Sequence, residues 1–149
     1  MQKITTYLWF DSQAAEAADH YASIFEDARI LNVHRTGGAV LTVTFELAGQ
    51  QFIALNGGPQ FPFTEAISLY VDCGSQEEVD ALWAKLSEGG EEGSCGWLKD
   101  KFGVSWQVIP RQLPELLGGS DPVRAERAMK AMLQMKKIDI QGLVDAYEQ

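Results

Sequence analysis

The chain has 149 residues, 46% of them hydrophobic, and a formal net charge of −9. This length suits one domain, or two small modules that share a core, and the apolar fraction argues against a disordered chain. No run of about 18 apolar residues occurs, so we expect no membrane span. The acidic charge disfavours long-range attraction to nucleic acid or anionic lipid.

The cysteine content and the first residues bear on the cellular compartment. The two cysteines are Cys73 and Cys95, and so few thiols favour a protein kept in a reducing environment. The residues from Met1 to Thr5 lead directly into strand-like sequence, without the apolar stretch of a secretory signal. We therefore expect a reduced, cytoplasmic protein.

The first part of the chain predicts a β-α-β-β-β order. Residues 4–10 are rich in β-branched and aromatic side chains, as in a strand, and Asp11 with Ser12 can cap a following helix. Three further strands are expected at 29–35, 40–47 and 51–56. The helix carries an apolar stripe at helical spacing, formed by Ala14, Ala17, Ala18, Tyr21, Ile24 and Phe25.

Glycine and proline interrupt this pattern at residues 57–62, which form the best internal boundary. The same order then restarts with a strand at 66–71. Ser75 is expected to cap the next helix, with Glu78 completing a capping box, and Gly89-Gly90 ends it. Residues 91–93 are expected to form a short strand.

A β-hairpin is expected at the end of the second half. It enters at 97–99, turns at 100–103 and returns at 104–109, and Pro110 ends the strand because it cannot donate to a ladder. Strand alternation separates a packed face from a face that lines a cleft. The packed face holds Trp106, Val108 and Pro110, and the cleft face holds Ser105, Gln107 and Ile109.

The two halves align with one another, which predicts an internal repeat. Phe10 aligns with Val71 at a shift of 61 residues, and Phe52 aligns with Trp106 at a shift of 54. We expect a single domain over 1–149, with module one at 1–58, module two at 64–112 and a helical tail at 113–149. Within the tail, Asp121-Pro122 begins a helix that runs to about Lys136, and Asp139 begins the last helix.

Several stretches resemble one known family, and together they cover nearly the whole chain. They are Tyr7–Asp11, Ala54–Pro59, Ala66–Asp72, Cys95–Asp100, Phe102–Gln107 and Met132–Asp139. With the repeat, they make the chain similar to the PhnB-like group often labelled demethylubiquinone 3-methyltransferase. That group belongs to the vicinal oxygen chelate superfamily, with glyoxalase I and bleomycin-resistance proteins.

The resemblance implies an α+β fold. Two βαβββ modules would form curved, mostly antiparallel sheets around a cleft, with C-terminal helices added. It also favours a homodimer, since members of the superfamily pair modules within or between chains. The apolar stripe of the tail, which must be buried against the body or a second subunit, agrees with this and consists of Ala125, Ala128, Met129, Met132 and Leu133.

Metal-dependent members of this superfamily place one His, Gln or Glu ligand on each of four strands. The matching places here are near Thr5, at Ile53 or Ala54, at Ala66 and at Gln107. Alanine, threonine and one neutral amide make a poor donor set for a divalent ion. His20 and His34 match none of these places, so we expect no metal and no cofactor.

The remaining candidates describe a partly apolar pocket for a small molecule. The residues expected to bind the ligand are Trp9, Asn56, Tyr70, Cys95, Trp97, Trp106 and Gln107. Core packing is the alternative for the tryptophans, a turn cap for Asn56, and an inert, partly buried thiol for Cys95.

Three functions follow from this resemblance and composition. The first is metal-free binding of a small ligand, and the second is a lyase or dioxygenase that requires a metal. The third is a methyltransferase, which would need a glycine-rich turn between a parallel strand and a helix. The glycine pairs of this chain fall instead at hairpins, linkers and helix ends.

Overall fold

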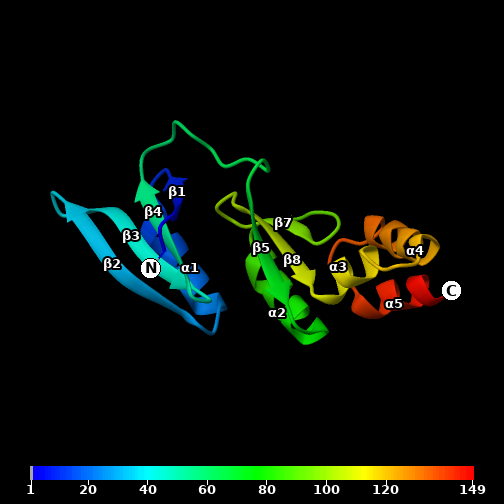
Figure 1. The fold of residues 1–149 in the computed structure, drawn as a ribbon. Coiled ribbons are helices and arrows are strands. Elements are labelled where there is room, and N and C mark those ends of the chain that lie inside the picture. Colours follow the sequence, from blue (N-terminus) through cyan, green and yellow to red (C-terminus); the bar gives the residue numbers. More distant parts are fainter. Residues whose placement is uncertain (1) are drawn as a thin grey trace. The chain divides into compact units, whose positions relative to one another are not determined.

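A computed structural model describes residues 2–149 (Figure 1). The chain divides into two compact units, the first ending at Phe63 and the second running from Thr64 to Gln149. Each unit contains a four-stranded sheet, which confirms the expected α+β class with two repeated β-α-β-β-β modules. The helical tail belongs to the second unit.

The first unit is a sheet with the strand order β1-β4-β3-β2. β1 and β4 run parallel, and the other neighbours are antiparallel. Alternate residues of β3 and β4, such as Phe45 and Ala54, are buried with the apolar stripe of α1. The elements are β1 (Thr6–Phe10), α1 (Ala14–Ile24), β2 (Ala28–Thr36), β3 (Ala39–Leu47) and β4 (Gln50–Asn56).

The start of α1 differs from the sequence expectation. Asp11 and Ser12 do not cap the helix, whose N-cap position is Gln13 without a side-chain hydrogen bond. The backbone N–H of Ala14 instead donates to Oδ1 of Asn56, at 2.8 Å, from the end of β4. The parallel pairing of β1 with β4 brings Asn56 beside Phe10, and therefore beside the helix that follows.

The second unit repeats this topology, with the strand order β5-β8-β7-β6 and a parallel β5–β8 pair. The predicted cap at Ser75 is confirmed, because the N–H of Glu78 donates to the Ser75 hydroxyl at 3.1 Å. The carboxylate of Glu78 accepts the N–H of Gly74, one residue before the N-cap position that a capping box uses. The elements are β5 (Ser68–Cys73), α2 (Gln76–Ser87), β6 (Glu91–Glu92), β7 (Trp97–Lys99) and β8 (Ser105–Pro110).

One face of this second sheet is covered by α2, which packs on β5, β7 and β8. Leu98, Trp106 and Val108 lie on the covered face and are fully buried or nearly so. Strand alternation turns Gln107 to the opposite face, where it is only half-buried. The predicted division of β8 into a packed face and an open face is therefore correct at these positions.

The tail forms three helices, α3 (Gln112–Leu117), α4 (Pro122–Leu133) and α5 (Ile140–Glu148). Asp121 caps α4 as predicted, but α4 ends three residues before Lys136. A small core, buried between the end of β8 and these helices, holds the tail on the second unit. Its members are Ile109, Leu113, Ile138 and Leu143.

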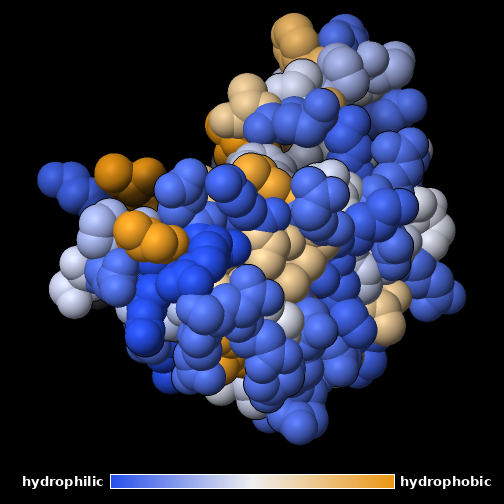
Figure 2. Space-filling view, turned by 90° about the vertical axis from the view of Figure 1, so that its right-hand side faces the viewer, coloured by the Kyte–Doolittle hydropathy of each residue, from blue (hydrophilic) through white to orange (hydrophobic). Residues whose placement is uncertain are grey.

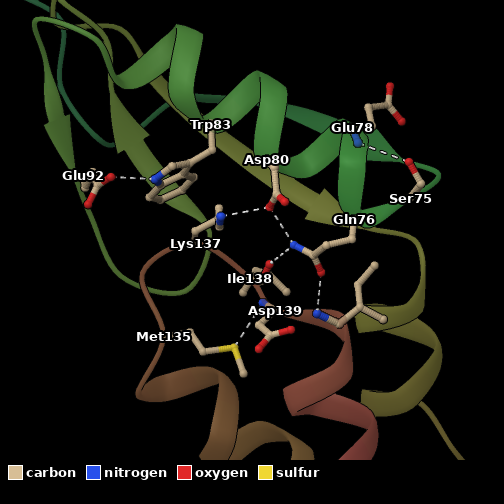
Figure 3. A network of polar contacts seen from close by, with 11 residues as sticks. Ser75, Gln76, Glu78, Asp80, Trp83, Glu92, Met135, Lys137, Ile138 and Asp139 are labelled. Atoms are coloured by element: carbon tan, nitrogen blue, oxygen red, sulfur yellow. Dashed lines mark hydrogen bonds and ion pairs between the residues drawn. The ribbon is translucent and has the colours of Figure 1, made fainter.

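Polar contacts also attach the tail to α2 (Figure 3). Asp139 stands at the N-cap of α5, but its side chain makes no capping hydrogen bond. The first N–H of α5, from Ile140, donates to Oε1 of Gln76 at 2.7 Å, and Nε2 of Gln76 donates to the Ile138 carbonyl at 3.0 Å. Lys137 forms an ion pair with Asp80 at 2.9 Å.

The outer side of α4 remains partly apolar. Val123, Met129 and Leu133 are 62%, 44% and 55% exposed. Figure 2 views the side on which Figure 1 draws α4 and α5, and it shows pale and orange apolar side chains among blue hydrophilic ones. No helix among residues 2–149 has both the length and the apolar character that a membrane crossing requires.

Candidate functional site

Three of the predicted ligand-binding residues form one row across the open face of the second sheet. Gln107 on β8 pairs with Tyr70 on β5 and with Trp97 on β7. Residues paired across neighbouring strands present their side chains on the same face. The three side chains therefore lie next to one another, on the face opposite Trp106.

Polar groups of this row are available to a ligand. Nε2 of Gln107 donates to the hydroxyl of Ser68 at 2.9 Å, while Oε1 has no hydrogen-bond donor within residues 2–149. Tyr70 is 54% exposed. Burial of its ring, and then the charges of Asp72 and Cys73, raise the pKa of the phenol above its usual value of 10.0, so it stays a hydrogen-bond donor.

A small cavity of about 120 Å³ lies beside the row. Across it, the ammonium of Lys99 forms an ion pair with the carboxylate of Glu65 at 2.9 Å. The hydrogen bond and the charge of Lys99 lower the pKa of Glu65, and the same pair raises the pKa of Lys99. The cavity is lined by Glu65, Glu91, Glu92, Gly93, Trp97, Leu98, Lys99 and Ser105.

Ser105 is a polar residue of this cavity that the sequence interpretation did not include among the ligand-binding residues. It is 1% exposed, and its hydroxyl has no hydrogen-bond partner in the described part of the chain. Its place two residues before Gln107 on the same strand face was the available signal. The Glu65–Lys99 pair left no local signal, because its members are far apart in the sequence.

Trp106 does not belong to the row. Its side chain is 2% exposed on the face covered by α2, and its indole N–H donates to the carboxylate of Asp100 at 2.9 Å. Of the two alternatives for this tryptophan, the structure therefore supports core packing.

Trp9 and Asn56 lie in the first unit and make local contacts there. The indole N–H of Trp9 donates to the Gly58 carbonyl at 2.9 Å, and its ring meets Phe61 edge-on at a centroid distance of 4.9 Å. The amide of Asn56 accepts from Ala14 and donates to the Val40 carbonyl at 3.1 Å. Both groups of Asn56 thus join β4 to its neighbours.

The two thiols occupy different environments. Cys73 is completely buried in β5, and burial, followed by the charges of Glu78 and Asp72, raises its pKa to about 12. Cys95 is half-buried, and its backbone N–H donates to the Met135 carbonyl in the tail. The structure places Cys95 at the junction of the hairpin and the tail, outside the Tyr70–Gln107–Trp97 row.

The described residues provide few metal donors. Within residues 2–149, no three His, Cys, Asp or Glu side chains gather into a group able to hold an ion. His34 is exposed on β2, and His20 lies on α1 with its ring 5.9 Å from that of Tyr21. Ala54, at one expected ligand position, is fully buried among apolar side chains.

Comparison with known proteins agrees with this architecture. A glyoxalase/bleomycin resistance protein from Albidiferax ferrireducens shares the fold, with a TM-score of 0.52 at 13% identity over 72% of this chain and 96% of its own. A protein from Pseudomonas aeruginosa reaches a TM-score of 0.61 at 19% identity, over 74% of this chain and 98% of its own. The fold is thus that of a glyoxalase/bleomycin resistance protein.

A closer relationship is seen at the level of sequence. The family model described as 3-demethylubiquinone-9 3-methyltransferase matches residues 2–109. A Bacillus cereus protein described as a 3-demethylubiquinone-9 3-methyltransferase, PhnB protein, is 38% identical over 73% of this chain and 99% of its own, with a TM-score of 0.69. No protein of curated function matches the chain. The chain belongs to this 3-demethylubiquinone-9 3-methyltransferase family, which confirms the PhnB-like resemblance.

Proposed function

We propose that this chain is a small-molecule-binding protein of the glyoxalase/bleomycin-resistance type that works without a metal. The ligand would lie on the open face of the β5-β8-β7-β6 sheet. The observation that carries this proposal is the row of Tyr70, Gln107 and Trp97 across three neighbouring strands.

The chemistry of the row suits a flat, partly apolar ligand. Trp97 and Tyr70 offer aromatic surface, and Gln107 between them offers a carbonyl oxygen without a partner in the described chain. Aromatic side chains with a few polar groups are typical of small-molecule sites. The phenol of Tyr70 adds a donor at the other side of the amide.

The side chains at the expected ligand positions support the absence of a metal from this function. Thr5, Ala54 and Ala66 offer no imidazole or carboxylate, and Gln107 uses its amide nitrogen to bind Ser68. One neutral oxygen is a weak ligand for zinc or a similar ion.

The flat, neutral probe 2-naphthol tests this proposal. Titration followed by amide shifts in NMR spectra is expected to perturb Tyr70, Trp97 and Gln107 in a saturable way. Gln107→Leu should weaken binding by about fivefold, the typical loss of one hydrogen bond. Gln134→Leu, an equivalent change at an exposed residue after α4, should leave it unchanged.

Failure of 2-naphthol to bind would overturn the proposal, and so would either of two other results. One is an affinity for 2-naphthol that neither Trp97→Ala nor Gln107→Leu changes. The other is zinc, nickel or manganese present in equal amount to the purified protein, whose removal by a chelator abolishes binding of the probe.

The name of the family suggests methyl transfer as a second candidate. The turn between β5 and α2 contains one glycine, Gly74, and the turn between β1 and α1 contains none. Nucleotide-type cofactors are usually held by several glycines at such a turn. Calorimetry with S-adenosylmethionine tests this candidate, since tight binding would favour it over the metal-free binding protein.

We also propose that the chain forms a homodimer through α4. Its exposed Val123, Met129 and Leu133 would be covered by a second copy. Five of the 12 Lys and Arg residues fall within residues 124–137, although the whole chain carries a charge of −9. This basic segment complements the acidic remainder of a second copy. Light scattering should report twice the chain mass for the wild type. For Met129→Glu it should report the mass of a single chain.

A further inference from the structure

The cavity beside the row has a defined position in the sheet. Ser105 on β8 pairs with Ser68 on β5 and with Lys99 on β7. Glu65 precedes β5, so the Glu65–Lys99 ion pair connects the two strands that flank β8. Ser105 lines the same cavity as this ion pair, and it is 1% exposed.

Negative charge exceeds positive charge in this cavity. Lys99 pairs with Glu91 across the β6–β7 ladder, and the charges of both Glu65 and Glu91 raise the pKa of Lys99. One ammonium therefore lies near two carboxylates. Glu92 also lines the cavity, but its carboxylate accepts the indole N–H of Trp83 at 2.8 Å (Figure 3).

The hydroxyl of Ser105 indicates that a polar group belongs in the cavity. A buried hydroxyl without a hydrogen bond costs free energy, and the hydroxyl has no partner within residues 2–149. A volume of about 120 Å³ leaves room for several water-sized groups. The space therefore suits a small polar end of a ligand.

We propose that this cavity binds a small cationic nitrogen group, a protonated amine or a guanidinium, at the end of the ligand. The inference rests on the proposed function, because the rest of that ligand would lie on the Tyr70–Gln107–Trp97 row. The carboxylates of Glu65 and Glu91 accept charge-assisted hydrogen bonds from the cation, and Ser105 accepts another. Trp97 lines the same cavity, and the ring of a tryptophan attracts a cation.

An anionic group fits this cavity less well. It would have to displace Glu65 from Lys99, and it would then lie next to the carboxylates of Glu65 and Glu91. Repulsion between like charges at close range opposes such binding.

Three probes of similar size separate these possibilities: methylguanidinium, the neutral analogue N-methylurea, and acetate. Amide shifts are followed in the full chain, with sodium chloride as the ionic-strength control. Methylguanidinium is expected to give saturable shifts at Lys99, Ser105 and the indole of Trp97. N-Methylurea should bind at least tenfold more weakly, and acetate should match sodium chloride.

Substitutions test whether Glu65 and Ser105 contribute to methylguanidinium binding. Glu65→Gln should weaken methylguanidinium binding by roughly tenfold, and Ser105→Ala by about threefold. Glu88→Gln makes the same charge change at an exposed residue after α2 and should have no effect. Circular dichroism of each variant checks that the fold is kept.

The inference is overturned if acetate or N-methylurea binds as well as methylguanidinium, or if Glu65→Gln and Glu88→Gln behave alike. Methylguanidinium shifts no larger than those with sodium chloride would also overturn the inference. Ordered water would then be the occupant of the cavity. If 2-naphthol binds the row while methylguanidinium does not bind, this inference fails and the proposed function stands. If methylguanidinium binds and 2-naphthol does not, the proposed function fails.

Discussion

The carboxylate of Asp100 accepts the indole N–H of Trp106 at 2.9 Å. Its other oxygen accepts the backbone N–H groups of Phe102 and Val104, at 2.9 and 3.0 Å. Asp100 is 3% exposed and Trp106 is 2% exposed. One carboxylate therefore fixes the turn of the hairpin and, at the same time, the core tryptophan on the strand that carries Gln107.

Asp100→Ala should destabilise the second unit strongly. The substitution removes the carboxylate that accepts hydrogen bonds from three buried or half-buried donors, so we expect a loss of about 3 kcal/mol in the free energy of unfolding. Urea unfolding followed by circular dichroism measures it. Asp19→Ala, at an exposed residue of α1, is the control, and equal midpoints for the two variants would contradict the prediction.

Asn56→Ala should weaken the start of α1. The amide oxygen of Asn56 accepts the N–H of Ala14 in place of a local cap, and its nitrogen donates to Val40. Loss of a helix cap and one further hydrogen bond is expected to cost about 2 kcal/mol. Asn32→Ala, on the exposed strand β2, should cost far less in the same urea titration.

Gln76→Ala should loosen the tail without disturbing the sheet. Gln76 lies on α2 and accepts the first N–H of α5 (Figure 3). We expect a loss of about 1 kcal/mol and faster hydrogen exchange in Ile140–Glu148, with β8 unchanged. Unchanged exchange in α5, or equal acceleration in Gln134→Ala, would show that Gln76 does not hold the tail.

Stability should depend on pH through Cys73. Burial raises the pKa of this thiol from 9.0 to about 12 in the folded chain. As the pH rises from about 9 to about 12, the unfolded chain loses the thiol proton while the folded chain keeps it, so stability falls. The urea midpoint of the wild type relative to Cys73→Ala should decrease across this range, and a constant difference would refute the prediction.

The order of strands and helices could be predicted from local sequence patterns, but the residues that cap the helices could not all be predicted in this way. Strand alternation and the cap at Ser75 are read within a few neighbouring residues, which explains their agreement with the structure. Asn56 and Gln76 cap helices that begin far away in the chain. No local pattern shows such a contact, so Asp11-Ser12 was chosen wrongly as the cap of α1.

The open face of β8 was predictable, and the surroundings of Gln107 were only partly so. Alternation separates Gln107 from Trp106 on one strand. Placing Tyr70 and Trp97 beside Gln107 requires the register of β5 and β7, which the structure supplies. The Glu65–Lys99 ion pair depends on the same register.

The attachment of the tail has a consequence for how the second unit can open. The family model ends at residue 109, and the backbone N–H groups of Cys95 and Gly96 bind the tail from a turn before β7, outside the strand ladders. Fraying of the tail would therefore break none of the hydrogen bonds that pair the strands of the second sheet.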